Sequence, residues 1–406
     1  MSLSLLSSGS NAHGQLANGT TDDAHTFTPA GANHTLVLTD STLWGCGDGS
    51  SGQLGNCGRE TDETVFRPID LGLAESGLEG YQARLISSTW ETSYVVLSSQ
   101  DAPDVLISMG RNDFGDLGVG ASVRTNAKLY HTIKFDHLCI GGLPLDERSL
   151  RVLSLAAGQH HVVVQIRARF ASEDGESNCR IILVGWGAAR HGQLGDTSSL
   201  DKRMRFFALP RIIDIPRPDD PVLSFALGNQ HSVFRHQSGR GSCLGSNKKS
   251  QTNGLDAFQD ISFVGCTWNG TYCVDVRGVM YATGSHLRGQ LGRSLLRDTE
   301  LASSASSSSI RPERVEVPFS VVPSPESVIA CGSEHVLVLR TNCTPAQVFG
   351  WGWNEHGNMG LDSTEDVYVP TKLWPRDGEK SDIKEMEGAV EGVWAGCGTS
   401  WIAIRN

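Results

Sequence analysis

A short turn recurs seven times along this chain between two apolar segments. A second motif, Gly-Gln-Leu-Gly or a variant of it, alternates with the turns, as at Gly52–Gly55 and Gly192–Gly195. A repeat of this size buries its apolar face only against neighbouring repeats, so the pattern predicts a repeat architecture. The expected turns are Gly31–His34, Thr89–Thr92, Gly158–His161, Gly228–His231, Thr267–Gly270, Gly332–His335 and Gly398–Trp401.

Each repeat reads as four short strands with turn residues between them. In the sixth repeat the expected strands are Ser327–Cys331, Val336–Leu339, Gln347–Gly352 and Pro370–Trp374. Four antiparallel strands of this length form one blade of a β-propeller. The sequence therefore predicts an all-β fold, a seven-bladed β-propeller of four-stranded antiparallel blades.

The two ends of the chain each supply half of a blade. Leu3–Ser8 precedes a Gly-Gln-Leu loop without a turn before it, whereas Gly392–Gly396 and Ser400–Ile404 flank a turn without a loop after it. Pairing of these N- and C-terminal strands would close the ring and remove exposed sheet edges. We expect one domain over residues 1–406.

Uneven spacing of the turns marks insertions and one shortened repeat. Insertions near 121–146, 167–179 and 295–312 are expected to form loops or hairpin extensions. Between His231 and Gly270 the spacing contracts, and Gly241–Ser246 replaces the usual third strand.

Composition argues against several classes of function. The net charge is −11 and no long run of Lys or Arg is present, which disfavours direct binding of nucleic acid. No apolar run is long enough to span a membrane. The ten cysteines are irregularly spaced, which favours reduced packing residues in an intracellular protein. No hydrolase, nucleotide-binding or zinc-protease motif occurs, so we expect no enzyme activity, no catalytic residue, no metal and no cofactor.

The histidines at the turns are interpreted as structural. His34, His161, His231 and His335 each begin a strand that points inwards. A partly buried imidazole needs hydrogen-bond partners for both nitrogens, so we expect these side chains to link neighbouring blades.

Tryptophans at the turn tips indicate a partner surface. Because the strands of a blade alternate in direction, the turns and the Gly-Gln-Leu-Gly loops lie on the same rim of the propeller. Trp90, Trp268 and Trp353 should therefore share one face. We expect Trp90 and Trp268 to form the binding hot spot on that face. Alternatively, the indoles fold back over the central channel, Tyr272 lies in the core and His356 tucks under the next blade. The predicted partner-binding residues are Trp90, Glu91, Trp268, Asn269, Tyr272, Trp353, Glu355 and His356.

The glycine-tryptophan strands identify a family resemblance. The chain resembles the regulator-of-chromosome-condensation repeat family over essentially its whole length. The segments that carry this resemblance are each followed by a loop of the Gly-Gln-Leu-Gly type, and they are Trp44–Gly47, Gly185–Gly187 and Gly350–Gly352. The resemblance implies a seven-bladed propeller. Members of this family include nucleotide-exchange factors, adaptors and ligase components, so the fold leaves the function open.

A narrower resemblance points to one fungal branch of that family. The family member concerned binds a small CSL-type zinc-finger protein with a four-cysteine metal site. The segments of this chain that are similar to it are Thr89–Thr92, Cys266–Gly270, Trp351–Asn358 and Ala395–Ile402. This resemblance implies a non-enzymatic regulatory subunit in a heterodimer with that electron carrier. The heterodimer would support diphthamide synthesis on elongation factor two and Elongator-dependent modification of tRNA wobble uridines.

The same resemblance implies a cytoplasmic and nuclear location and only indirect links to Elongator and to the radical enzyme of diphthamide synthesis. Two alternatives stay open. One is guanine-nucleotide exchange on a Ran-like small GTPase, with the insertion at 121–146 as the wedge. The other is a general protein-interaction adaptor.

Overall fold

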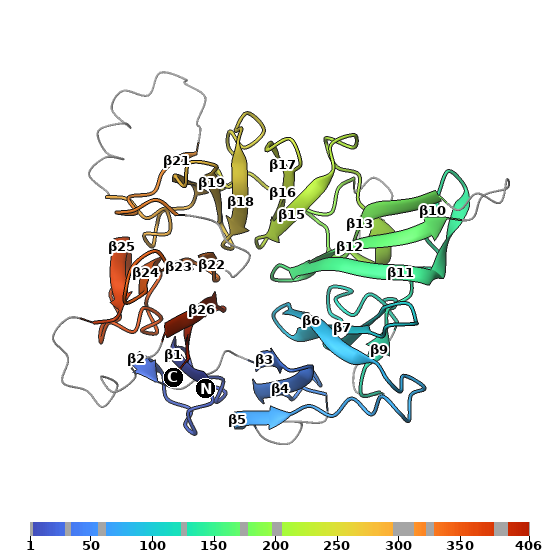
Figure 1. Ribbon diagram of the computed structural model, residues 1–406, viewed down its shortest axis with the longest axis horizontal. Coiled ribbons are helices and arrows are strands. Elements are labelled where there is room, and N and C mark those ends of the chain that lie inside the picture. Colours follow the sequence, from blue (N-terminus) through green and yellow to red (C-terminus); the bar gives the residue numbers. More distant parts are fainter. Residues whose placement is uncertain are drawn as a thin grey trace. The chain divides into compact units, whose positions relative to one another are not determined.

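The structure is a computed structural model that describes residues 3–28, 34–55, 62–122, 128–170, 178–196, 205–294, 312–321, 329–376 and 389–405. Every regular element in these ranges is a β-strand (Figure 1), as expected for an all-β chain. The chain divides into two compact units. Unit 1 comprises Met1–Asn33 and Asp219–Asn406, and unit 2 comprises His34–Pro218.

Unit 1 holds four antiparallel sheets. In the order of their neighbours they are β2 (Ala24–Thr28), β1 (Leu3–Gly9), β27 (Thr399–Arg405) and β26 (Ala389–Ala395); β15 (Val222–Leu227), β16 (His231–His236) and β17 (Gly241–Gly245); β18 (Ile261–Cys266), β19 (Gly270–Asp275), β20 (Met280–Gly284) and β21 (Glu313–Arg314); and β22 (Ile329–Cys331), β23 (His335–Arg340), β24 (Gln347–Gly352) and β25 (Val367–Trp374).

Unit 2 holds the other three sheets. They are β3 (His34–Thr39), β4 (Thr42–Gly47) and β5 (Glu63–Pro68); β6 (Gln82–Ser88), β7 (Thr92–Ser98), β8 (Val105–Gly110) and β9 (His131–Thr132); and β10 (Cys139–Ile140), β11 (Leu143–Ala157), β12 (His161–Phe170), β13 (Asn178–Ala188) and β14 (Phe206–Ile212). The seven sheets are the blades of a seven-bladed β-propeller, which confirms the predicted fold.

The first and last strands of the chain share one blade. Strand β1 lies between β2 and β27, and Ser7 of β1 pairs with Trp401 of β27. The N-terminal segment thus supplies the two outer strands and the C-terminal segment the two inner ones. This arrangement agrees with the closure expected from the sequence.

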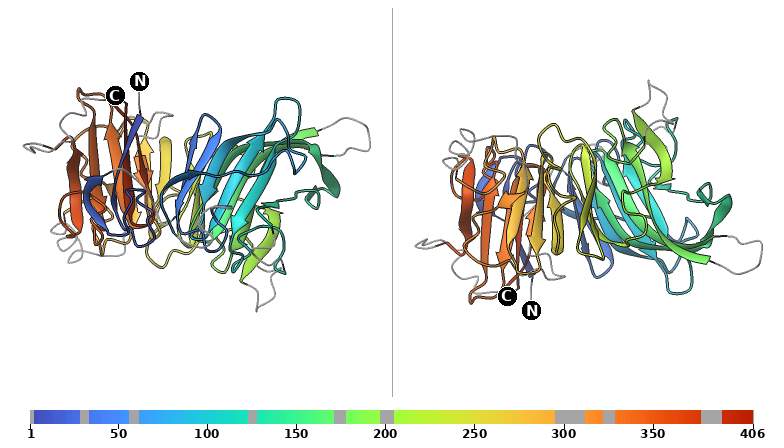
Figure 2. Two further views of the ribbon diagram at one scale, coloured as in Figure 1. Left: turned by 90° about the horizontal axis from the view of Figure 1, so that it is seen from below. Right: turned by 90° about the horizontal axis from the view of Figure 1, so that it is seen from above.

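The insertions have different outcomes. The segment at 121–146 supplies β9, the additional strand β10 and the start of β11, and the segment at 167–179 lengthens the β12–β13 hairpin (Figures 1 and 2). Residues 295–311 lie outside the described part of the chain. The shortened repeat forms β15–β17, a sheet of three strands.

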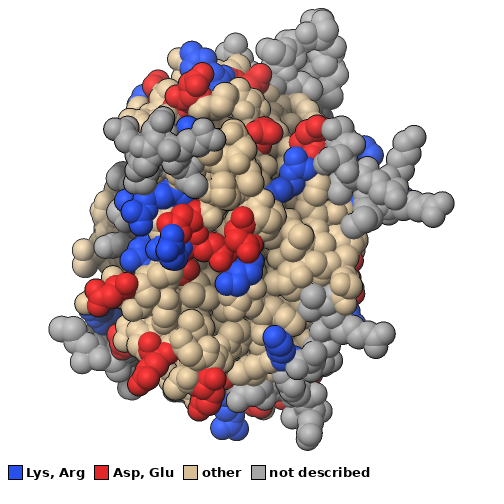
Figure 3. Space-filling view, turned by 90° about the vertical axis from the view of Figure 1, so that its right-hand side faces the viewer, with Lys and Arg blue, Asp and Glu red and all other residues tan. Residues whose placement is uncertain are grey.

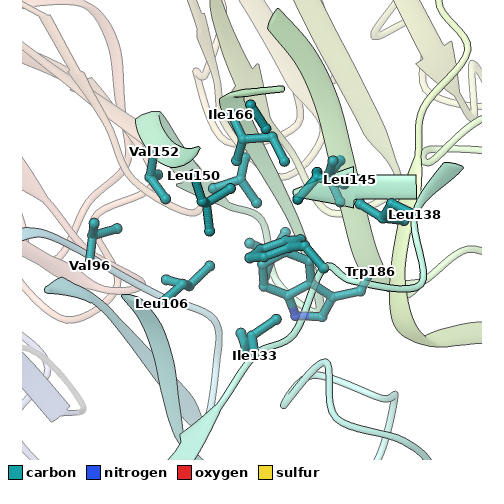
Figure 4. Packing of buried hydrophobic residues seen from close by; sticks show 14 of the residues in the cluster. Val96, Leu106, Ile133, Leu138, Leu145, Leu150, Val152, Ile166 and Trp186 are labelled. Carbon is teal, nitrogen blue, oxygen red and sulfur yellow. The ribbon is translucent and has the colours of Figure 1, made fainter. Parts of the chain in front are cut away.

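Each blade packs its apolar residues against the next sheet of the same unit. In unit 2 the fully buried Trp186 lies among Ile133, Leu145 and Ile166 (Figure 4). In unit 1, Tyr272 and Trp351 belong to one such cluster. These buried aromatics account for much of the core, since each removes a large apolar area from water.

Two aromatic side chains from adjacent blades donate to a single loop carbonyl. The Tyr272 hydroxyl lies 2.6 Å from the Gln290 carbonyl oxygen, and the Trp351 indole Nε1 lies 2.9 Å from the same atom. Tyr94 and Trp186 bond to the Asp116 carbonyl in the same way, at 2.7 and 2.8 Å. The Gly-Gln-Leu-Gly type of loop therefore ties neighbouring blades together.

Glycine is required where the third strand of a blade meets the turn. Gly352 has φ +107°, and a Cβ there would lie 2.4 Å from the Glu334 carbonyl oxygen. Both the positive φ and the close approach exclude a side chain.

Charged residues of both signs are interspersed on the face drawn in Figure 3. In unit 2 the buried Asp104 carboxylate lies 2.9 Å from Arg84 and 3.4 Å from Arg151. No helix in the described residues has the length and hydropathy needed to cross a membrane.

Candidate protein-binding surface

In unit 1, hydrogen bonds connect the turns of successive blades. Within the turn at Thr267–Gly270, the first N–H donates to the last carbonyl, at 3.0 Å. Asn229 N–H then donates to the Trp268 carbonyl at 3.0 Å, and Trp268 N–H donates to the Ser333 carbonyl at 2.6 Å. Trp268 is therefore held between the turns on either side, which restricts its backbone in a way that a free loop would not.

The closing turn lies two residues before the position expected from the sequence. The Gly396 N–H donates to the Thr399 carbonyl at 2.8 Å, so the turn is Gly396–Thr399. Thr399 therefore stands where other turns carry histidine. Trp401 lies inside β27, buried opposite Ser7 at the junction of the two chain ends.

Trp353 is held against the same turns. Its N–H donates to the Glu334 carbonyl at 2.9 Å, and its indole Nε1 donates to a Glu355 carboxylate oxygen at 3.1 Å. The indole meets the His356 ring edge to face at 5.2 Å. A Cβ placed on Gly398 would lie 3.5 Å from both rings, so the two rings border the closing turn.

Glu334 lies between the two tryptophan-bearing segments. One carboxylate oxygen accepts from Asn269 Nδ2 at 2.5 Å and the other from Gln290 Nε2 at 2.9 Å. Burial raises the pKa of this carboxyl, while those hydrogen bonds and the charge of Lys249 oppose the rise. The sequence alone did not single out Glu334, because many polar residues occupy that turn position in other repeats.

The other predicted residues of unit 1 divide into surface and core positions. Glu355 is exposed and lies 3.7 Å from Arg288. His356 Nδ1 lies 2.8 Å from Asp23, a residue near the N-terminal strand. Tyr272 is fully buried, so this residue belongs to the core, and its assignment to the partner surface is corrected. Both Trp268 and Trp353 are half-buried.

Two of the predicted partner-binding residues, Trp90 and Glu91, lie in unit 2. The Trp90 side chain is 38% exposed, and its N–H donates to the Gln159 carbonyl at 3.0 Å. Glu91 forms a two-pronged ion pair with Arg111, at 2.8 and 3.0 Å, which raises the pKa of that guanidinium. Trp90 remains a predicted partner-binding residue.

Two aromatic residues near Trp90 were missed by sequence reasoning. Phe114 is 40% exposed, and its ring centre lies 4.3 Å from that of His160. The His160 imidazole in turn lies 3.5 Å from the buried Asp116 carboxylate. A Phe next to the Gly-Asp-Leu-Gly loop could have indicated this patch, because the other loops carry polar or small residues there.

Three of the four turn histidines link neighbouring blades through Nε2, whereas the predicted hydrogen bond at the second ring nitrogen is not found among the described residues for His231 and His335. His34 Nε2 lies 3.0 Å from the Ser93 hydroxyl, His231 Nε2 lies 2.9 Å from the Thr271 hydroxyl, and His335 Nε2 lies 3.1 Å from the Thr399 carbonyl. Burial lowers the pKa of each from 6.5 to about 4, so all three are neutral at pH 7. His161 is fully buried as well.

These histidines should make the stability of the protein depend on pH. Each folded-state pKa lies near 4 and each unfolded value near 6.5, so the unfolded chain binds more protons between those pH values. The free energy of unfolding should therefore fall as the pH drops from 6.5 to 4. In the His231→Gln variant, the slope of the unfolding free energy against pH near pH 5 should be smaller than in the wild type by about 1.4 kcal/mol per pH unit. Urea unfolding at several pH values measures it; an unchanged slope would contradict the neutral assignment.

Three cysteine thiols of unit 1 have raised pKa values. Burial raises the pKa of the Cys273 and Cys331 thiols to about 12, and that of Cys397 to about 11, so these groups are protonated. A protonated thiol is a poor nucleophile and a poor metal ligand. No cluster of three or more His, Cys, Asp or Glu residues suited to a metal ion occurs in the part of the chain that the structure describes.

Comparison with known proteins supports the same fold. Residues 346–398 match the family model described as the regulator of chromosome condensation (RCC1) repeat. The chain is 27% identical to the RCC1 repeat-containing protein C10F6.04 of Schizosaccharomyces pombe, covering 99% of both chains. It is 24% identical to the secretion-regulating guanine nucleotide exchange factor of Bos taurus, covering 84% of this chain and 69% of the relative.

A solved structure of similar shape is that of Prp20p from Saccharomyces cerevisiae, described with its binding properties to Gsp1p and histones. The TM-score is 0.72 with 15% identity, covering 99% of this chain and 91% of that one. Identity this low shows a shared fold and nothing about shared ligands.

Proposed function

We propose that this chain, an RCC1-like repeat propeller, is a non-catalytic subunit that binds a small protein through the turns of unit 1. The observation that carries the proposal is the grouping of Trp268, Glu334 and Trp353. Backbone hydrogen bonds connect all three through the Gly332–His335 turn, and both indoles keep part of their surface in solvent. Tryptophans beside a partly desolvated polar group are typical of binding hot spots.

The partner that the sequence favours is the small CSL-type zinc-finger protein. The supporting resemblance includes the Trp351–Asn358 segment, which contains Trp353 and also His356, whose Nδ1 lies 2.8 Å from an Asp23 carboxylate oxygen. In the proposed heterodimer the propeller regulates an electron carrier for diphthamide synthesis and supports Elongator-dependent tRNA modification. The fungal alpha-tubulin suppressor protein is the family member that this segment resembles.

Binding to the purified zinc-finger protein tests the proposal directly. We expect a stable complex of one copy of each chain by size-exclusion chromatography with light scattering, and a dissociation constant measurable by calorimetry. A Ran-like GTPase serves as the comparison protein. The absence of any complex with the zinc-finger protein at tens of micromolar would reject this partner.

Guanine-nucleotide exchange is the second candidate function. Similarity to the secretion-regulating guanine nucleotide exchange factor over most of this chain favours it. An exchange factor should accelerate release of a fluorescent GDP analogue from its GTPase at catalytic concentrations. Acceleration without any binding of the zinc-finger protein would favour exchange over the heterodimer.

A further inference from the structure

The third strand of one blade has an unpaired outer edge. In the other sheets the third strands β1, β4, β8, β13, β20 and β24 pair with the outer strands β2, β5, β9, β14, β21 and β25. In the described part of the chain, β17 pairs only with β16. The shortened repeat therefore leaves one blade without its outer strand.

The register shows which backbone groups face this open edge. Ser246 N–H donates to the Gln230 carbonyl and His236 N–H donates to the Arg240 carbonyl, at 2.8 and 2.9 Å. Hydrogen bonding alternates along an antiparallel pair, so Ser242 and Leu244 face β16, whereas Gly241, Cys243 and Gly245 face outwards. Among the described residues, no hydrogen bond to these outward backbone groups is present.

Access to the edge differs along the strand. Gly241 is buried, and a Cβ there would lie 3.0 Å from the Leu255 carbonyl oxygen. Cys243 is half-buried and Gly245 is exposed. The accessible backbone groups are therefore those of Cys243 and Gly245.

The complete blades show which kind of segment covers such an edge. In two of them, Ile69 N–H donates to the Leu43 carbonyl at 2.8 Å and Ile213 N–H donates to the Leu183 carbonyl at 2.9 Å. Both isoleucines, which directly follow β5 and β14, are buried. An extended segment thus covers the third strand of a complete blade. The counterpart of Leu43 in β17 is Gly241, where Leu255 already lies, so a bound segment would cover only the part of the edge at Cys243 and Gly245.

Positive charges flank the open edge at both ends. Arg240 precedes β17 and Lys248 and Lys249 follow it, and all three are exposed. None of them forms an ion pair with another residue that the structure describes. The charge of Lys249 also acts on Glu334, whereas those of Arg240 and Lys248 complement an acidic segment, in a protein whose overall charge is −11.

We propose that the outer edge of β17 binds an extended, acidic segment of a partner protein, which adds to the sheet as its missing outer strand. Main-chain hydrogen bonds to Cys243 and Gly245 would provide affinity. Arg240, Lys248 and Lys249 would select acidic residues at the ends of the segment. Strand addition of this kind is a common way to bind an extended peptide at a sheet edge. The strand residues of this site differ from those of the proposed heterodimer surface, and Lys249 lies close enough for its charge to act on Glu334.

A labelled peptide tests the proposal. The probe is a fluorescent octapeptide made of two aspartates followed by the sequence of residues 62–67, which copies the part of an outer strand that would lie opposite Cys243 and Gly245. Cys243→Pro removes an outward N–H without removing a bond to β16, and should weaken binding about tenfold. Cys243→Val keeps the N–H and should bind within about twofold of the wild type. The double variant Lys248→Glu, Lys249→Glu should lose about fivefold at low salt.

Several outcomes would overturn the proposal. The first is that the peptide does not bind the wild-type protein, and the second is that it binds the Cys243→Pro variant equally well. The third is that the wild-type protein is a dimer and the Cys243→Pro variant a monomer, because the edge would then bind a second copy of this chain. Amide exchange serves as the check if Cys243→Pro does not fold. The Cys243 and Gly245 amides should exchange quickly in the free protein and slowly with peptide bound, and slow exchange in the free protein would contradict an open edge.

Discussion

Replacing Trp268 and Trp353 together with alanine should weaken binding of the zinc-finger partner by at least about a hundredfold, because hot-spot tryptophans contribute about 2 kcal/mol or more each. Both indoles are half-buried, so the substitutions remove little core packing. The melting temperature should therefore change by only a few degrees, about what 1 kcal/mol produces. Calorimetric titration with the purified partner measures the effect.

The control for this variant is Val276→Ala. Val276 is 69% exposed and follows β19, the strand that begins directly after the Trp268 turn, so it lies at the opposite end of the same strand. We expect wild-type binding from this variant. Wild-type binding by the double tryptophan variant would reject the turns of unit 1 as the docking surface, whereas binding lost equally in both variants would indicate general destabilisation.

Trp351→Ala should lower the free energy of unfolding by about 3–5 kcal/mol, the range for truncating a buried aromatic residue. Trp351 is fully buried between two blades, and its Nε1 bonds to the Gln290 carbonyl. The substitution leaves a large cavity and removes one of the two donors to that carbonyl. Urea unfolding measures the change.

The conservative variant Trp351→Phe separates packing from hydrogen bonding. It keeps most of the ring volume but has no Nε1–H, while the Tyr272 hydroxyl still bonds to the Gln290 carbonyl. Its loss should be clearly smaller, about 1–3 kcal/mol. Equal losses for the two variants would mean that the hydrogen bond, and not the cavity, dominates. A loss below 1 kcal/mol for Trp351→Ala would contradict the interblade role.

Most of the fold could be predicted from the sequence because the signals are local. The expected strand Gln347–Gly352 coincides with β24, and the expected pairing of the two chain ends occurs between β1 and β27. Glycine turns and short apolar runs specify such strands without reference to distant residues. The closing turn was misplaced by two residues because Gly396 and Gly398 offer equally good turn signals.

The candidate site could be predicted only in part. Trp268 and Trp353 stand out because tryptophan is unusual at a turn tip, yet Tyr272 lies in the core, two residues into the strand that Trp268 precedes. Alternation along a strand makes neighbouring residues face different surroundings, and the sequence does not show which face is covered. Glu334 and Phe114 gain their importance from contacts with segments distant in the chain.

By itself, the sequence determined the repeat, the number of blades and the joining of the two ends, since these follow from residue patterns within each repeat. Only the tertiary structure decided that Glu334 accepts hydrogen bonds from Asn269 and Gln290, that His356 pairs with Asp23, and that β17 has an open edge. Burial, pairing and accessibility are properties of surfaces brought together from distant parts of the chain. They arise when blades pack against one another, and no single repeat encodes them.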